Sequence, residues 1–278
     1  MPVELAPVTR TDVPCVCAFL HEHLDVDVSP ERWARAVDVP WSPGLGFMLL
    51  DAGRVVGVQL AWSSERTVGG REERFCNLGS WCVLPAYRSH SLRLLRAALG
   101  DRDCSYTDLT PRPEVVAINE RLGFRHMDTT AVLVPNLPWP VRGSVSSDPA
   151  VLERTLTGMS LQRYRDHASA EPARHVVLRR GTSWCYVMVR IDRRRGLRTA
   201  SLLHVSDPEL LAAMSKPLAR HLLVRHGAVA TLVEDRIAGR RPSPAFALRR
   251  TQPKMFRSSH LGPADVDDLY SELVFQPW

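Results

Sequence analysis

Residues 83–92 decide the fold, and they are Val83-Leu84-Pro85-Ala86-Tyr87-Arg88-Ser89-His90-Ser91-Leu92. The apolar run 75–84 before them has the composition of a buried strand, and Pro85 stops that strand. Apolar positions then recur at helical spacing from Ser91 until Gly100 ends the helix. The stretch therefore predicts a strand, an arginine-containing turn and a helix N-terminus, a place where backbone N–H groups can hold an anion.

The residues around this stretch predict alternating strands and helices in one mixed α/β domain. A hairpin is indicated by two apolar runs that flank the turn Asp51-Ala52-Gly53-Arg54. Gly123 is placed to end a helix, and Phe124 follows it. The predicted strands are 3–8, 47–50, 55–62, 75–84, 105–109 and 131–134, and the predicted helices are 11–23, a short one from 29, 91–99 and 114–122.

The segment Pro135-Asn136-Leu137-Pro138-Trp139-Pro140 predicts a stiff, extended connector. We expect a first domain at 1–134, a linker at 135–148 and a second domain at 149–278. The second half predicts helices at 149–164, 208–226 and 263–273, strands at 175–178, 184–191, 199–205, 228–233 and 245–248, and a basic turn at 192–197. The similar order of elements suggests an internal duplication.

Composition narrows the classes of protein that the chain can represent. It has 278 residues, 45% of them hydrophobic, which is ample for buried cores. No apolar run approaches the roughly 20 residues that span a bilayer, and residues 1–5 lack a signal-peptide pattern, so we expect a cytoplasmic protein. The six cysteines predict reduced core thiols, and Cys15-Val16-Cys17 lacks a second ligand pair, so we expect no metal.

Charge is distributed unevenly along the chain. Residues 1–138 carry 14 arginines against 17 acidic residues, whereas residues 139–278 carry 22 basic against 13 acidic residues. A basic half can meet nucleic acid, an anionic membrane or a phosphorylated ligand. No aromatic residues interleave Arg193-Arg194-Arg195, so a solvated turn is favoured. We expect neither a nucleic-acid nor a membrane partner.

The pattern Val83-x-Pro85-x-x-Arg88, followed about 35 residues later by Gly123-Phe124, resembles the GNAT family of acyl-CoA-dependent N-acyltransferases. The resemblance covers 1–134 well and 149–278 weakly. It implies two GNAT-like domains in tandem, the second degenerate, and a sheet that splays between 75–84 and 105–109 around the pantetheine arm of acetyl-CoA. It also implies that the Val83 N–H polarises the thioester carbonyl, and that the pyrophosphate is held by Arg88, Ser89, His90, Ser91 and Leu92.

The chain departs from the family pattern at four positions. Ser91 and Arg93 stand where the family pattern has small residues in the phosphate loop. Asn77 stands where family members often carry a glutamate base, and Asn119 where a tyrosine commonly protonates the thiolate. Asparagine exchanges no proton at neutral pH, so acid–base work must come from another group or from water.

Four other residues are candidates for proton transfer or nucleophilic chemistry. His21 and His23 titrate in a useful range, but histidines on a helix are commonly surface residues. Asp108 ends a predicted strand, and its alternative role is to cap the turn at Thr110-Pro111. Cys104 as a nucleophile needs an adjacent base, and the sequence shows none.

The second half carries Asp207 and Glu209 in the corresponding loop, where they would repel a pyrophosphate. We therefore interpret it as a degenerate copy that helps wall the acceptor pocket, and Tyr270 either reaches that pocket or belongs to the core. The leading hypothesis is an N-acyltransferase acting on a small-molecule amine by direct attack, with a monomer plausible as a pseudo-dimer. A non-catalytic protein that kept the fold is the alternative, and a nucleic-acid-binding module is a weaker third.

Overall fold

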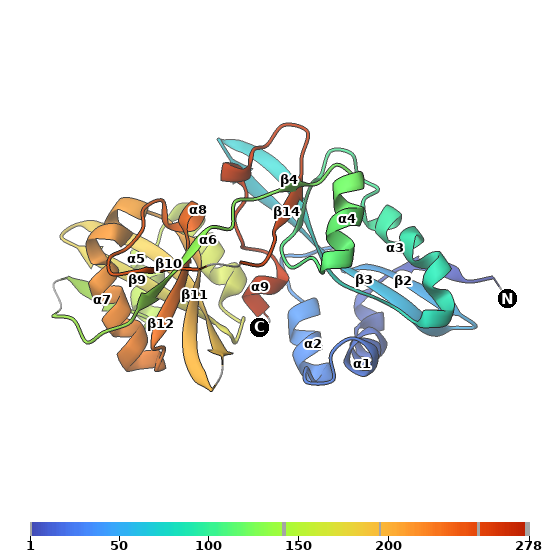
Figure 1. Ribbon diagram of the computed structural model, residues 1–278, viewed down its shortest axis with the longest axis horizontal. Helices are drawn as coiled ribbons and strands as arrows, with labels where there is room; N and C mark the ends of the chain where they lie inside the picture. The colour runs from blue at the N-terminus through green and yellow to red at the C-terminus, as the bar shows by residue number, and fades with distance from the viewer. Residues whose placement is uncertain (1, 141–142, 195, 249–250, 276–278) are drawn as a thin grey trace. The chain divides into compact units, whose positions relative to one another are not determined.

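The computed structural model describes residues 2–140, 143–194, 196–248 and 251–275. Its contacts divide the chain into two units, each built on a seven-stranded mixed sheet (Figure 1). The first unit runs to Met127 and adds Pro253–Val266 and Tyr270–Glu272 from the end of the chain. The second unit takes Asp128–Gln252, Asp267–Leu269 and the segment from Leu273.

The first sheet has the order β1-β2-β3-β4-β5-β14-β6. β4 and β5 run parallel, and every other neighbouring pair is antiparallel. The strands are β1 Glu4–Pro7, β2 Gly46–Asp51, β3 Arg54–Val68, β4 Arg71–Val83, β5 Ser105–Asp108, β6 Arg125–His126 and β14 Met255–Arg257.

The second sheet has the order β8-β9-β10-β11-β12-β7-β13 when it is followed from the opposite edge. Here β11 and β12 are the parallel pair, and the other neighbouring pairs are antiparallel. The strands are β7 Ala131–Pro135, β8 Ser144–Ser146, β9 Ala173–Arg180, β10 Ser183–Arg194, β11 Leu197–Val205, β12 Ala230–Glu234 and β13 Phe246–Ala247.

The two sheets follow one plan, which supports the predicted duplication, and each takes its sixth strand in spatial order from the other half of the chain. β14 lies between β5 and β6, and β7 lies between β12 and β13. The strand Ala131–Pro135, expected to close the first domain, is therefore part of the second sheet. A strand's own sequence does not specify which sheet the strand joins. Local pattern therefore could not predict that β14 takes the place in the first sheet that was expected for β7.

The predicted linker 135–148 lies within the second unit. Asn136 holds its start, because its backbone N–H donates to the Val229 carbonyl at 2.9 Å and its side-chain Nδ2 donates to the Ala228 carbonyl at 2.9 Å. The Thr231 hydroxyl donates to Asn136 Oδ1, also at 2.9 Å. A proline-rich segment is stiff and extended, and here that segment is fixed against the sheet by one buried asparagine.

Helices cover both faces of the first sheet. α3 (Ser91–Ala98) and α4 (Pro113–Arg121) pack apolar residues against Cys76, Leu78 and Tyr106 on one face. α1 (Val13–His23) contacts β3 and β4, and the Trp62 indole donates to the Ala36 carbonyl of α2 (Pro30–Val37) at 2.9 Å. These elements agree with the helices that the sequence predicts.

The helices of the second unit correct two predictions. The expected helix 149–164 is divided into α5 (Pro149–Thr155) and α6 (Gly158–His167), because Gly158 has a left-handed φ of 54°. The expected helix 263–273 is a 3-10 turn, Pro263–Asp265, an irregular stretch and the short α9 (Glu272–Phe275). Tyr270, with φ 58°, interrupts any continuous helix there. The remaining helices are α7 (Pro208–His226) and α8 (Asp235–Ala238).

The predicted basic turn 192–197 is also shorter than expected, because β10 continues to Arg194. Asp192 is buried, and its carboxylate pairs with Arg190 at 2.7 Å and accepts a hydrogen bond from Ser201 at 2.6 Å. Arg193 and Arg194 are exposed, as expected. Within the described parts of the chain, no helix combines the length and the apolar character needed to cross a membrane.

The exchanged strand β14 provides a test of how much the first unit depends on the end of the chain. Phe256 on β14 is 2% exposed, and the Arg125 guanidinium lies 4.7 Å from its ring centroid. We expect Phe256→Ala to lower the free energy of unfolding by about 3–5 kcal/mol, because it opens a cavity in a packed core. Equilibrium urea unfolding measures this loss.

Phe246→Ala is the matched control, because Phe246 lies on the short strand β13 and is 64% exposed. We expect that variant to change the free energy of unfolding by less than about 1 kcal/mol. Equal losses in the two variants would show that β14 does not contribute the packing assigned to it.

Candidate functional site

The parallel strands β4 and β5 separate toward their C-terminal ends. Their Cα partners run from Phe75 and Ser105 to Leu78 and Asp108, where β5 ends. β4 continues to Val83, paired with β3. Among the described residues no strand pairs with 79–83 on the β5 side, so the backbone of this part of β4 can meet a ligand.

A β-bulge sets the direction of the backbone at this point. Ser80 has a left-handed φ of 45° and lies between Gly79 and Trp81, where the register with β3 shifts. Beyond the bulge, the Leu84 N–H donates to the Val56 carbonyl at 3.0 Å. Since alternate residues of an antiparallel ladder turn their N–H toward the partner, the Val83 N–H points away from β3. That is the direction its predicted role requires.

A buried polar network lies where the two strands separate. Asn77, fully buried, donates through Nδ2 to the Glu272 carboxylate and accepts through Oδ1 from the Thr107 hydroxyl at 2.9 Å. The Thr110 hydroxyl donates to Glu272 Oε1 at 2.7 Å. The Asn77 side chain thus joins β4 and β5 to the end of the chain, and it does so without a proton of its own to transfer.

Glu272 is the member of this network that the sequence analysis missed. It is 2% exposed and comes from the segment that returns after β14. A Cβ added to Gly79 would lie 3.5 Å from Glu272 Oε2 and 2.6 Å from the Trp62 ring. Gly79 therefore leaves room for the Trp62 ring, while the carboxylate lies at an ordinary contact distance, so this glycine signals a close approach without pointing to Glu272.

Asp108 is the second buried carboxyl group at this point. It follows Thr107 on β5, so its side chain turns to the opposite face, where Asn119 Nδ2 of α4 donates to Oδ2 at 2.8 Å. Burial, followed by the negative charge of Glu272, raises the pKa of Asp108 to about 7. A backbone hydrogen bond from Thr110 opposes this shift, so the predicted turn-capping contact is present. The carboxyl group can gain or lose a proton near neutral pH.

Asn119 carries an unused acceptor beside Asp108. The side chain is fully buried, and its Oδ1 has no hydrogen-bond partner within the described part of the chain. A buried polar atom without a partner costs about 1–3 kcal/mol. Among the described residues, Asn119 Oδ1 is thus an unsatisfied acceptor beside the Asp108 carboxyl group.

The loop 85–92 is more regular than expected. Pro85–His90 form a 3-10 helix that leads directly into α3, and the Ser91 N–H donates to the Arg88 carbonyl. The side chains of Arg88, Ser89 and Leu92 are exposed, while His90 is half-buried.

Two contacts hold this loop in place. The Tyr87 hydroxyl donates to Asp51 in the β2–β3 turn at 2.5 Å. Arg93, which replaces a small residue of the family pattern, donates to the Val3 carbonyl at 3.0 Å, so its bulk is directed toward the first strand.

The structure places the other candidates outside the network. His21 Nδ1 lies 3.0 Å from the Val28 carbonyl, and the His23 ring packs edge-on against Phe19. Burial raises the pKa of Cys104 to about 11, which disfavours the thiolate. Tyr270 is buried, and its ring lies edge-on to Trp41 at 5.0 Å, so it belongs to the core.

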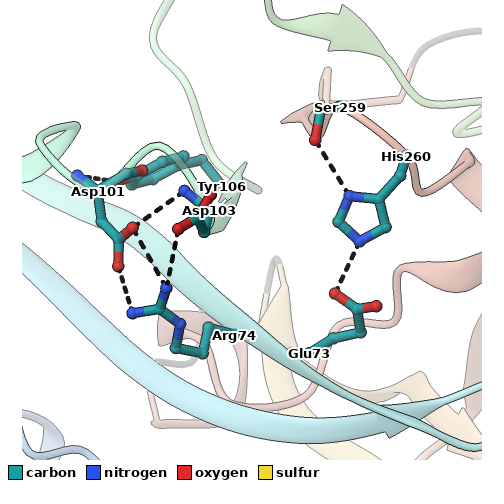
Figure 2. A network of polar contacts seen from close by, with 7 residues as sticks. All are labelled: Glu73, Arg74, Asp101, Asp103, Tyr106, Ser259 and His260. Carbon is teal, nitrogen blue, oxygen red and sulfur yellow. Dashed lines mark hydrogen bonds and ion pairs between the residues drawn. The ribbon is translucent and has the colours of Figure 1, made fainter.

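The N-terminal parts of β4 and β5 are fixed by polar contacts to neighbouring segments (Figure 2). Arg74 on β4 pairs with Asp101 at 2.7 Å, just before β5. His260, which follows β14, pairs with Glu73 at 2.7 Å. Figure 2 also shows Asp103 beside Arg74 and Ser259 beside His260. These contacts hold β4 and β5 together where the strands begin, so the two strands separate only toward their C-terminal ends.

The corresponding loop of the second unit differs in its charge. Asp207 caps α7 by accepting the Leu210 N–H at 2.9 Å. A carboxylate of the chain itself thus occupies the helix N-terminus, where an anionic ligand would otherwise bind.

Comparisons with known proteins establish the fold. No protein-family model matches the sequence, and no curated protein does. The chain is similar in structure to a GCN5-related N-acetyltransferase from Anabaena variabilis, with TM-score 0.62 and 11% identity over 92% of this chain and 72% of that one. A putative acetyltransferase from Pyrococcus horikoshii gives TM-score 0.60 and 12% identity over 96% and 92%. Saccharomyces cerevisiae N-myristoyltransferase with bound myristoyl-CoA gives 0.53 and 11% over 97% and 84%.

These likenesses confirm the predicted fold class. The chain has the mixed α/β fold of GCN5-related N-acetyltransferases, and its two sheets repeat one strand order. At this level of identity the likeness concerns the fold.

The pH dependence of stability tests the environment of Asp108. Its folded pKa of about 7 exceeds the ordinary value of 3.8, so between these values the folded state keeps a proton that the unfolded state releases. The contribution of Asp108 to stability is therefore present below pH 4 and lost as pH rises toward 7. Asp108→Asn removes this loss. Relative to the wild type, its free energy of unfolding should therefore rise by a few kcal/mol between pH 4 and pH 7, at about 1.4 kcal/mol per pKa unit.

Urea unfolding at a series of pH values measures this difference. Asp27→Asn, at an exposed carboxylate, is the control and should not reproduce the trend. A difference between Asp108→Asn and the wild type that stays constant from pH 4 to pH 7 would contradict the assignment.

Proposed function

We propose that this chain is an acyl-CoA-dependent N-acyltransferase that moves an acyl group, most simply acetyl, to the amine of a small molecule by direct attack. One observation carries the proposal. In a chain with the GNAT fold, β4 and β5 separate beside the Val83 amide, and Asp108, a carboxyl group with a pKa of about 7, lies at the point of separation.

The proposed chemistry uses two groups of the first unit. The Val83 N–H donates to the thioester oxygen as negative charge develops on it. The amine nitrogen forms the new bond to the carbonyl carbon, and its proton passes through intervening water to the Asp108 carboxylate. The C–S bond then breaks, and Asp108 returns the proton to the thiolate.

Asn77 and Glu272 act by positioning in this proposal. Burial, and after it the Glu272 charge, raises the pKa of Asp108 into the range where a general base is effective. Asn77 and Thr110 hold the Glu272 carboxylate by hydrogen bonds. The asparagines at the family's usual acid and base positions therefore do not remove the chemistry, because Asn119 orients the Asp108 carboxyl group that performs it and Asn77 holds Glu272.

The donor is proposed to bind along the separating strands, with its phosphates at 85–92. Arg88 supplies a charge-assisted contact, and Ser89, His90 and Ser91 supply polar groups around it. Leu92 is exposed beside them and offers an apolar contact. Because the Ser91 N–H already has a partner, Arg88 carries the largest share of phosphate binding.

A protein that binds an acyl-CoA without turning it over is the second candidate. It is favoured by the two asparagines and by the internally bonded loop. Binding and turnover are therefore measured separately.

Titration calorimetry with coenzyme A tests the donor site. Arg88→Glu replaces an attractive charge with a repulsive one, so we expect its Kd to rise by roughly tenfold to a hundredfold. Arg102→Glu, another exposed arginine of the first unit, is the matched control and should leave the Kd unchanged. Equal affinity of the Arg88 variant and the wild type would show that 85–92 does not hold the pyrophosphate.

Thiol release from acetyl-CoA with a panel of amines tests the chemistry. We expect Asp108→Asn to lower kcat by roughly a hundredfold to ten-thousandfold with the coenzyme A affinity retained. Glu272→Gln removes the neighbouring negative charge, so the apparent pKa of the rate should fall below that of the wild type. Asp27→Asn is the control for both measurements.

The outcomes separate the two functions. Full activity of Asp108→Asn would exclude Asp108 as the base while leaving the transferase assignment intact. Coenzyme A binding without amine-dependent thiol release would support the binding protein instead.

A further inference from the structure

Three segments of the second unit meet at one end of its sheet. The tip of the β10–β11 hairpin continues into Arg198, whose carbonyl accepts the Val229 N–H at 2.9 Å. Arg198 also donates to the carbonyl of His226, at the end of α7. The Asn136 N–H, which follows β7, donates to the Val229 carbonyl. We call this surface the basic end, and its residues are Leu137, Arg193, Arg194, Leu197, Arg198, Val224, Arg225 and Val229.

The basic end carries positive charge that acidic groups do not neutralise. Its four arginines are exposed, and within the described part of the chain none of them forms an ion pair. His226 next to them has its pKa lowered to about 4, first by burial and then by His221, Arg174, Arg225 and Arg198. Burial chiefly keeps this histidine neutral, and the nearby cations add to the effect.

Exposed aliphatic side chains come from the same segments as these arginines and from the residues next to them. Leu197 is 57% exposed at the hairpin tip, and Val224 is 66% exposed at the end of α7. Leu137 and Val229 are 40% and 39% exposed on the adjoining segments. Large apolar groups exposed among charges on one surface mark an interaction site more often than an inert one.

We propose that the basic end docks the protein peripherally onto an anionic lipid surface. The arginines contact the lipid phosphates and carboxylates, and the four aliphatic side chains enter the boundary between headgroups and acyl chains. This departs from our expectation of no membrane partner, which interpreted the arginines at 193–195 as a solvated turn. The inference is independent of the proposed transferase activity.

Two other occupants fit the surface less well. A second copy of the chain would bring like charges together without acidic groups to offset them. Single-stranded nucleic acid is bound through aromatic stacking as well as cations, and the basic end has aliphatic residues instead. Anionic lipid is the partner that uses both the charges and the apolar groups.

Co-sedimentation of the full chain with lipid vesicles tests the proposal. Vesicles of phosphatidylcholine with about a quarter of phosphatidylserine should bind the protein, and the binding should weaken as salt is added. Vesicles of phosphatidylcholine alone should bind it at least tenfold more weakly. Arg193→Gln, Arg194→Gln and Arg225→Gln combined should weaken binding roughly a hundredfold, at about fivefold per arginine.

A second variant separates lipid insertion from charge alone. Leu197→Ser with Val224→Ser should also weaken vesicle binding by about tenfold or more. Val26→Ser, at a first-unit valine that is 68% exposed, and Arg96→Gln with Arg102→Gln are the matched controls and should bind like the wild type. Circular dichroism establishes that each variant is folded.

The proposal is overturned by any of three results. They are no binding to anionic vesicles at low salt, equal binding by the Leu197/Val224 variant and the wild type, and displacement of the protein from vesicles by a short oligonucleotide at lower concentration than by soluble phosphatidylserine.

Discussion

The exchange of β14 is the constraint on which the first unit depends. β14 is flanked by β5 and β6, so it supplies backbone hydrogen bonds on both edges and buries Met255 and Phe256. Without it, β5 would present an open edge beside the site, which is unfavourable for a buried strand. The segment that brings β14 also brings Glu272 to Asn77 and Thr110. β14 and the Glu272 carboxylate thus both come from the C-terminal part of the chain that returns to the first unit.

The position of the site follows from where β4 and β5 stay paired and where they separate. Arg74, Asp101 and the contacts around Ser258 hold β4 and β5 at their beginnings. Beyond Leu78 the bulge at Ser80 keeps β4 on β3, while β5 turns off at Asp108. Burial at this divergence disfavours the ionised form of Asp108, and the nearby Glu272 charge adds to the effect, so the pKa of Asp108 is raised to about 7. Backbone geometry therefore sets the acidity of Asp108.

Local signals predicted most of the elements, including the strand that stops at Pro85 and the helix that begins at Ser91. They also identified Asp108 as a residue to examine, and the family resemblance identified Asn77 and Asn119. They could not predict that Ala131–Pro135 pairs with β12, or that Met255–Arg257 pairs with β5, because such pairings depend on contacts between segments far apart in the chain. Glu272 was missed for the same reason. Within the predicted helix 263–273 it was an ordinary acidic residue, and only the return of the chain places it beside Asn77.

The two units show how one strand order supports different surfaces. In the first, the turn after the long parallel strand presents Arg88, and in the second it presents Asp207, which caps its own helix. A capped N-terminus has little remaining affinity for an anion, so the second unit is poorly suited to bind a phosphorylated donor at that turn. Its positive charge is instead concentrated at the opposite end of β11, beside Arg198, where apolar residues are also exposed. The same strand order thus carries an acidic turn at one end of the second sheet and exposed arginines at the other.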